Sequence, residues 1–126
     1  MMNYLKLTTL DGIFAICKLD KSDSIPEWAT IKNVYSISRT LEELSIVCLE
    51  ENVPNDITCE RNWRMLKIEG PLDFNLVGIL SSIIEPLAKA KISIFAISTY
   101  NTDYIMVKSK QFAQTIHVLK EKGFNI

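Results

Sequence analysis

The sequence predicts an α+β fold in which two helices cover one face of an antiparallel sheet. Residues 64–126 alternate between strand and helix patterns in the order strand, helix, strand, strand, helix, strand. Apolar residues recur at helical spacing over 75–90 and 111–122. A chain of 126 residues that is 48% hydrophobic and 23% charged can form a core, as one compact unit or two very small ones.

The overall composition excludes several classes of partner. A net charge of −1 provides no field that would attract nucleic acid or an anionic membrane. No apolar run approaches the roughly 20 residues that a membrane span needs, and no signal-peptide pattern occurs. Cys17, Cys48 and Cys59 show no CxxC spacing and are expected to be reduced, mostly buried thiols. We therefore expect a cytoplasmic protein with no nucleic-acid or membrane partner.

The first segment has the pattern of a β-hairpin followed by a short helix. Tyr4–Leu10 and Ile13–Leu19 are β-rich and flank an Asp-Gly pair, which favours a tight two-residue turn. Ser24 is then expected to cap a short helix that has Pro26 in its first turn.

Residues 34–62 are predicted to contain strands and a linker. Val34–Ser38 is a predicted strand, and Thr40–Glu43 fits a capping box. The next residues fit either a helix or a strand, and we favour one helical turn followed by a strand over 45–49. Residues 50–62 are expected to be a linker. The predicted domains are 1–59, a half without a long helix, and 60–126.

The second half begins with a strand over 64–69 and a helix over about 75–90. Pro86 lies inside the helix and should kink it or distort its last turns, because proline cannot donate a backbone hydrogen bond to Ser82. The apolar stripe that should face the sheet comprises Leu76, Ile79, Leu80, Ile83, Ile84, Leu87 and Ala88.

The remaining elements complete a split β-α-β-β-α-β arrangement, which is ferredoxin-like. Residues 92–99 are apolar on both faces, which is typical of a central strand. A turn over 100–103 leads to a strand over 104–108. A helix over 111–122 should direct Phe112, Ala113, Ile116 and Leu119 inward, and 124–126 should form a last strand. The first-half sheet or a second copy of the chain would cover the other sheet face.

The sequence contains no catalytic constellation, so we predict that the protein is not an enzyme. The only histidine, His117, lies in a predicted surface helix, and the four glycines are all separate. No cofactor is expected, and no metal site, because the cysteines are not clustered in sequence and no second histidine exists. An acid/base pair of Asp73 and Asp103, or a cysteine nucleophile, is the least favoured alternative.

Polar residues instead gather at two places that the predicted topology brings together. In a β-α-β-β unit, the loop after the first strand lies beside the end of the second strand. Asp73, Asn75 and the N–H groups of 76–78 would then face 98–100. Helix N-terminal N–H groups suit a carboxylate, and Asp103 suits an ammonium or guanidinium group. The pattern fits a site for a zwitterionic amino acid, the alternative being turn and cap residues without a ligand.

The run from Gly70 to Lys108 resembles an ACT domain, an amino-acid-sensing regulatory unit. Within that family it is similar to small stand-alone tandem ACT proteins related to aspartate-kinase regulatory domains and to the cytosolic arginine sensor of animals. The resemblance rests on Glu85-Pro86-Leu87, on ISTYNTDYIMVK from Ile97 to Lys108, and on LSIVC over 44–48. It covers the chain from about Leu5 to the C-terminus.

The resemblance implies two ACT-like units, the first degenerate, and an amino-acid ligand bound at an interface between ACT units. Since the chain has one complete unit, such an interface implies a homodimer. A module that only mediates protein interaction or oligomerisation is the alternative. Leu76 stands where the sensor would have a charged contact, which argues against arginine as the ligand. The implied ligand-binding residues are Asp73, Phe74, Asn75, Leu76, Val77, Gly78, Thr99, Tyr100 and Asp103.

Overall fold

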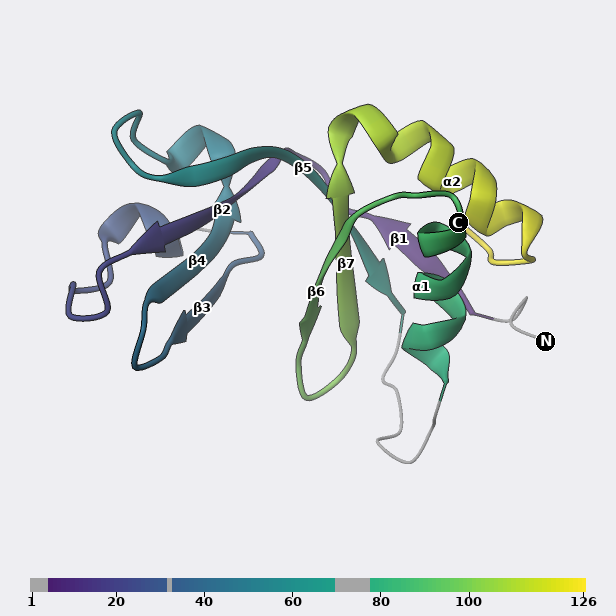
Figure 1. The fold of residues 1–126 in the computed structure, drawn as a ribbon, viewed down its shortest axis with the longest axis horizontal. Coiled ribbons are helices and arrows are strands. Elements are labelled where there is room, and N and C mark those ends of the chain that lie inside the picture. The colour runs from purple at the N-terminus through teal and green to yellow at the C-terminus, as the bar shows by residue number, and fades with distance from the viewer. Residues whose placement is uncertain (1–4, 32, 70–77) are drawn as a thin grey trace. The chain divides into compact units, whose positions relative to one another are not determined.

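The structure, a computed structural model, describes residues 5–31, 33–69 and 78–126 (Figure 1). The chain forms two compact units: Gly12–Trp63, and Met1–Asp11 together with Arg64–Ile126. Strand β5 (Cys59–Ile68) contributes residues to both units. Within the described ranges, no helix is long and apolar enough to cross a membrane.

The unit Gly12–Trp63 is a small antiparallel sheet. Its strands are β2 (Phe14–Leu19), β3 (Ser36–Arg39), β4 (Leu44–Leu49) and the first part of β5, in the order β3-β4-β2-β5. Two 3₁₀ helices, η1 (Glu27–Thr30) and η2 (Glu50–Asn52), complete the unit. One apolar cluster forms the core, made by Ala15, Cys17, Ala29, Leu44, Ile46, Cys48 and Val53.

The predicted hairpin around Asp11-Gly12 is wrong. Strand β1 (Leu7–Thr9) pairs antiparallel with 66–68 of β5, and β2 pairs antiparallel with 59–63 of the same strand. Both strands therefore run in the same direction along β5 and are not paired with each other. Gly12 still has the positive φ of 96° that an Asp-Gly pair accommodates. Pairing with the ten-residue β5 overrides the local preference for a reversal.

The region around Thr40 is a hairpin turn between β3 and β4, so the predicted helical turn is wrong. The Thr40 Oγ1 atom accepts hydrogen bonds from the backbone N–H groups of Glu42 and Glu43, at 3.0 and 3.1 Å. These are the contacts of a helix cap, but the chain then enters β4, as the β-branched run over 45–49 indicates. The short helix η1 also lacks the predicted Ser24 cap, because it begins after Pro26 with no side-chain cap.

The second unit has the predicted α+β organisation. It contains α1 (Ile79–Lys89), β6 (Ile94–Ser98), β7 (Asp103–Lys108), η3 (Ser109–Gln111) and α2 (Phe112–Glu121). The strand order is β1-β5-β7-β6, in which β1 pairs antiparallel with β5 and β6 pairs antiparallel with β7. Side chains of both helices pack with one face of this sheet in a single core. The buried residues of this core are Leu5, Leu7, Leu66, Ile68, Ile79, Ile83, Leu87, Ile92, Ile105, Val107, Leu119 and Phe124.

Two strand predictions in this unit need correction. Residues 92–99 were expected to be central, but β6 ends the strand order and its residues are half-buried or exposed. Its apolar residues are therefore those of an edge strand, which the hydrophobic pattern alone cannot distinguish from a central one. The predicted last strand is reduced to one bridge between Lys6 and Asn125, because β1 occupies the place beside β5.

The helices follow the predicted apolar pattern with local differences. Helix α1 continues through Pro86, and Ser82 Oγ donates to the Ile79 carbonyl at 2.6 Å. Ala88 is exposed, so the buried stripe is narrower than predicted. In α2, Ala113 is exposed, and Thr115 is fully buried in its place, with its hydroxyl donating to the Gln111 carbonyl at 2.8 Å. That bond explains why a polar residue occupies the core-facing position.

Candidate functional site

The turn between β6 and β7 is closed by hydrogen bonds between two threonines. The Thr99 backbone N–H and hydroxyl both donate to the Thr102 carbonyl, at 2.8 and 3.0 Å. The Thr99 hydroxyl also accepts from the Thr102 N–H at 3.3 Å. A turn held by both backbone and side chain keeps its shape, so the residues it carries have a defined position.

The same turn is attached to the end of β5. Thr102 is 5% exposed, and its hydroxyl donates to the carbonyl of Ile68, the last residue of β5. A buried hydroxyl needs a partner, and this one joins segments 34 residues apart in sequence. The end of β5 and the β6–β7 turn thus lie side by side. The loop that was predicted to face residues 98–100 lies outside the described residues, except for Gly78.

Glu69 places a negative charge directly after β5. Its carboxylate accepts a hydrogen bond from the Thr8 hydroxyl and lies 3.7 Å from Lys67 Nζ. The Thr8 hydrogen bond, with smaller contributions from Lys67 and Lys6, holds the pKa of the Glu69 carboxyl below its usual value of 4.5. This end of the sheet therefore carries an ionised carboxylate at neutral pH.

Helix α1 begins at the same end of the unit (Figure 1). The helix starts at Ile79, not near residue 75, and Gly78 precedes it with a left-handed φ of 81°. The first helical hydrogen bond runs from the Ser82 N–H to the Gly78 carbonyl, at 2.8 Å. The N–H groups of the first helical turn are consequently those of residues 79–81, later in the chain than predicted.

The structure describes four of the nine predicted ligand-binding residues. Thr99, Tyr100 and Asp103 belong to the β6–β7 turn and its flanks, with Tyr100 81% exposed and Asp103 opposite Ser98 in the strand register. Gly78 is exposed at the start of α1. The five others, residues 73–77, lie outside the described residues.

The sequence analysis does not identify Thr102, which lies within the predicted turn over 100–103. Its side chain joins the turn to β5. The spacing of Thr99 and Thr102, three residues apart around a polar turn, is the signal that could have indicated paired hydroxyls.

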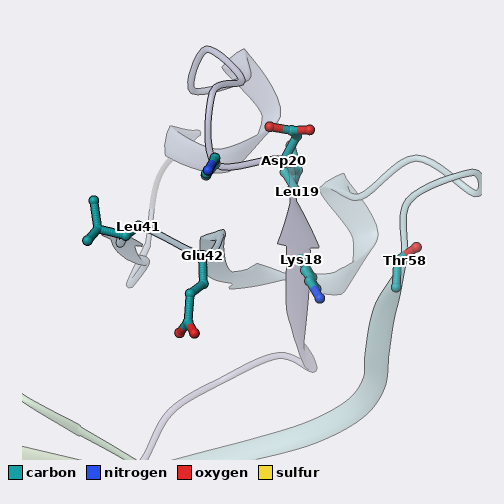
Figure 2. A pocket seen from close by; sticks show the side chains of 7 residues that line it. Lys18, Leu19, Asp20, Leu41, Glu42 and Thr58 are labelled. Carbon is teal, nitrogen blue, oxygen red and sulfur yellow. The ribbon is translucent and has the colours of Figure 1, made fainter.

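The unit Gly12–Trp63 has a surface hollow of about 730 Å³ (Figure 2). Its lining includes positively charged lysine side chains, negatively charged carboxylate side chains and the apolar Leu41. The lining residues are Lys18, Leu19, Asp20, Lys21, Leu41, Glu42 and Thr58. Leu41 is 91% exposed, and the charged groups are also exposed. Water therefore competes for each charged group, and the hollow offers no desolvated anchor for a ligand.

The described residues contain no group of three or more His, Cys, Asp or Glu side chains that could hold a metal ion. The end of β5 brings together the hydroxyls of Thr8 and Thr102, the Glu69 carboxylate and the Lys67 ammonium group. Such groups can hold a small polar molecule by hydrogen bonds and charge.

Comparison with known sequences identifies the family. A model of the ACT domain matches residues 58–121, about half of the chain. The chain belongs to the ACT domain family. A second family model, which describes an N-terminal domain, matches residues 12–56.

Individual relatives agree with this assignment. The ACT protein is 32% identical over 125 residues to the cytosolic arginine sensor for mTORC1, subunit 1, of Pongo abelii. The match covers 91% of this chain but 38% of the relative, so the chain spans well under half of that protein's length.

Two solved structures show the extent of the shared fold. A protein of Agobacterium tumefaciens superposes with a TM-score of 0.91 at 38% identity, covering 96% of this chain and 90% of that one. The aspartate kinase of Clostridium acetobutylicum, described as an allosteric enzyme, gives a TM-score of 0.66 at 11% identity, over 94% of this chain and 34% of the kinase chain. At that identity the kinase shows a common fold only.

Proposed function

We propose that this ACT protein is a regulatory protein that binds a small amino acid at an interface between ACT units. The bond from buried Thr102 to the Ile68 carbonyl carries the proposal, because it holds the β6–β7 turn against the end of β5. The proposed ligand-binding residues remain those implied by the sequence, from Asp73 to Gly78 with Thr99, Tyr100 and Asp103. The similarity to a protein named as an arginine sensor supports an amino acid as the class of ligand.

In the proposed site, each charged group of the ligand binds a protein group of opposite charge or partial charge. The ligand's ammonium would lie against the Asp103 carboxylate. The ligand's carboxylate would accept from N–H groups at the start of α1, where the helix dipole favours negative charge. The absence of arginine-specific charge at Leu76 leads us to expect a smaller amino acid than arginine.

The interface that completes the site requires an opposing ACT unit, which we propose is supplied by a second copy of the chain. The proposal also includes the domain division at residues 59 and 60, a cytoplasmic location and no catalytic activity. The cytosolic location stated in the name of the arginine sensor supports the location.

A thermal-shift screen of the twenty amino acids tests ligand binding. A ligand at about 100 times its Kd should stabilise the protein by roughly 2.7 kcal/mol. Asp103→Ala should abolish the shift, whereas Asp56→Ala, which removes an exposed carboxylate from the other unit, should retain it. A screen without any shift at millimolar concentration would contradict the proposal.

A module that only mediates protein interaction is the second candidate. Four of the five large exposed apolar side chains among the described residues lie in the unit Gly12–Trp63: Ile25, Ile31, Tyr35 and Leu41. This function predicts that the screen fails while Leu41→Ser weakens capture of a protein partner from a lysate.

A further inference from the structure

Three thiols come together on one face of the sheet in Gly12–Trp63. Cys17 lies on β2, Cys48 on β4, and Cys59 is the first residue of β5. Cys17 and Cys48 are part of the unit's apolar core, and Cys59 packs against it. The three cysteines are separated in the sequence, with 30 residues between Cys17 and Cys48 and ten between Cys48 and Cys59.

Cys17 and Cys59 are direct cross-strand neighbours. They face each other in the antiparallel register of β2 and β5. The adjacent pair is hydrogen-bonded, since the Lys18 N–H donates to the Thr58 carbonyl at 3.0 Å. Hydrogen-bonded and non-hydrogen-bonded pairs alternate, so Cys17 and Cys59 occupy a non-hydrogen-bonded position, where Cα atoms are about 4.5 Å apart. That separation lies within the range of about 4.4–6.8 Å that a disulfide requires.

Cys48 is close to Cys17 but is less well placed for a covalent bond. The residue opposite Cys48 is Ala15, and the residue opposite Cys17 is Ile46, so the two cysteines are diagonal neighbours. Diagonal Cα atoms are about 7–8 Å apart, beyond the separation that a disulfide bridges without backbone movement. The two thiols instead share a hydrogen bond, which raises the pKa of Cys17 and lowers the pKa of Cys48.

Exposure decides which thiol an oxidant reaches first. Cys17 and Cys48 are 1% and 3% exposed, whereas Cys59 is partly exposed. Burial raises the pKa of the Cys59 thiol, and Arg61, two residues further along β5, opposes this change. Oxidation through the Cys59 thiolate should therefore become faster as pH rises toward its pKa.

We propose that Cys17 and Cys59 form a thiol oxidation site that hydrogen peroxide converts into an intramolecular disulfide. The Cys59 thiolate attacks one peroxide oxygen, the O–O bond breaks, and a sulfenic acid and hydroxide result. The Cys17 thiol then attacks the Cys59 sulfur, the S–S bond forms, the S–O bond breaks, and the second hydroxide leaves. The two hydroxides take up the two thiol protons as water, so the thiols lose two electrons and the peroxide gains them.

The test is oxidation of the full chain with hydrogen peroxide at pH 8.5, followed by thiol counting in denaturant and peptide mapping. The accessible thiols should fall from three to one, and dithiothreitol should restore all three. Mapping needs a glutamate-specific protease as well as trypsin, because no Lys or Arg separates Cys48 from Cys59. The expected product is a peptide cross-linked through Cys17 and Cys59.

Matched variants distinguish this bond from its competitors. Cys48→Ala should still lose both remaining thiols, whereas Cys59→Ser should retain its two, since its remaining pair is diagonal. Mapping of the unmodified chain keeps the test valid if a buried substitution prevents folding. A Cys17–Cys48 cross-link, a disulfide between chains, or sulfinic acid at Cys59 without a cross-link would each overturn the proposal.

Discussion

At the scale of single residues, Thr102 should matter for stability as well as for the proposed site. Its hydroxyl is the hydrogen-bond donor to the Ile68 carbonyl in a buried position. Thr102→Val keeps the shape and removes the donor, so the free energy of unfolding should fall by about 1–3 kcal/mol. Urea unfolding measures this loss. Thr102→Ser retains the hydroxyl and should lose less, and equal stability of the Val and Ser variants would show that the hydrogen bond contributes nothing.

The pKa of Glu69 provides a second prediction at this scale. Its depressed value means that the folded state favours the carboxylate, mainly through the Thr8 hydroxyl. The stabilisation is present above the unfolded pKa and is lost as pH falls through the lower folded pKa. Thr8→Val should raise the Glu69 pKa in an NMR titration of the carboxyl carbon, and Thr8→Ser should not. An unchanged pKa in Thr8→Val would assign the shift to the lysines instead.

At the scale of elements, the start of α1 depends on Gly78. A left-handed φ of 81° disfavours residues with a Cβ, although a Cβ built at this position would meet no atom within 4 Å. Gly78→Ala should therefore destabilise the protein through backbone strain alone, by about 1–2 kcal/mol. Asn tolerates this conformation better, so Gly78→Asn should unfold at a higher denaturant concentration than Gly78→Ala. The reverse order would mean that the helix start shifts to accommodate the side chain.

The elements also show what the sequence could and could not predict. Helical periodicity predicted α1 and α2, and a β-branched run predicted β4, because a buried face imposes its own spacing. The polar turn over 100–103 predicted β7 as the returning strand. The hydrophobic pattern did not predict which strands pair with each other. The Asp-Gly pair is compatible with a reversal or with a bend, and only the long-range pairing with β5 decides between them.

The candidate site was also predicted only in part. Topology predicted that the loop after β5 would lie beside the end of β6, but residues 70–77 of that loop lie outside the described residues. The described residues show the β6–β7 turn bonded to Ile68 at the end of β5. The residue that joins them, Thr102, was not predicted, because a threonine in a polar turn gives no sign of burial. Similarly, the three cysteines gather through strand register, which no local pattern in the sequence encodes.

At the scale of the whole molecule, we expect the proposed homodimer to form through the exposed edge strand of the second unit. Among the described residues, β6 pairs with β7 alone, and its Ala96 is exposed. Edge strands with unpaired backbone groups favour association, and charged side chains on them oppose it. Light scattering at micromolar concentration should therefore give twice the chain mass of 14.4 kDa.

Ala96→Lys should shift the measured mass to that of one chain, because the added ammonium would have to be desolvated along the paired edge. The matched control is Ala113→Lys, which adds the same charge at an exposed alanine of α2 and should leave the mass unchanged. A single-chain mass for the unmodified protein would contradict the dimer. A dimer that persists in Ala96→Lys would show that the interface does not include the β6 edge.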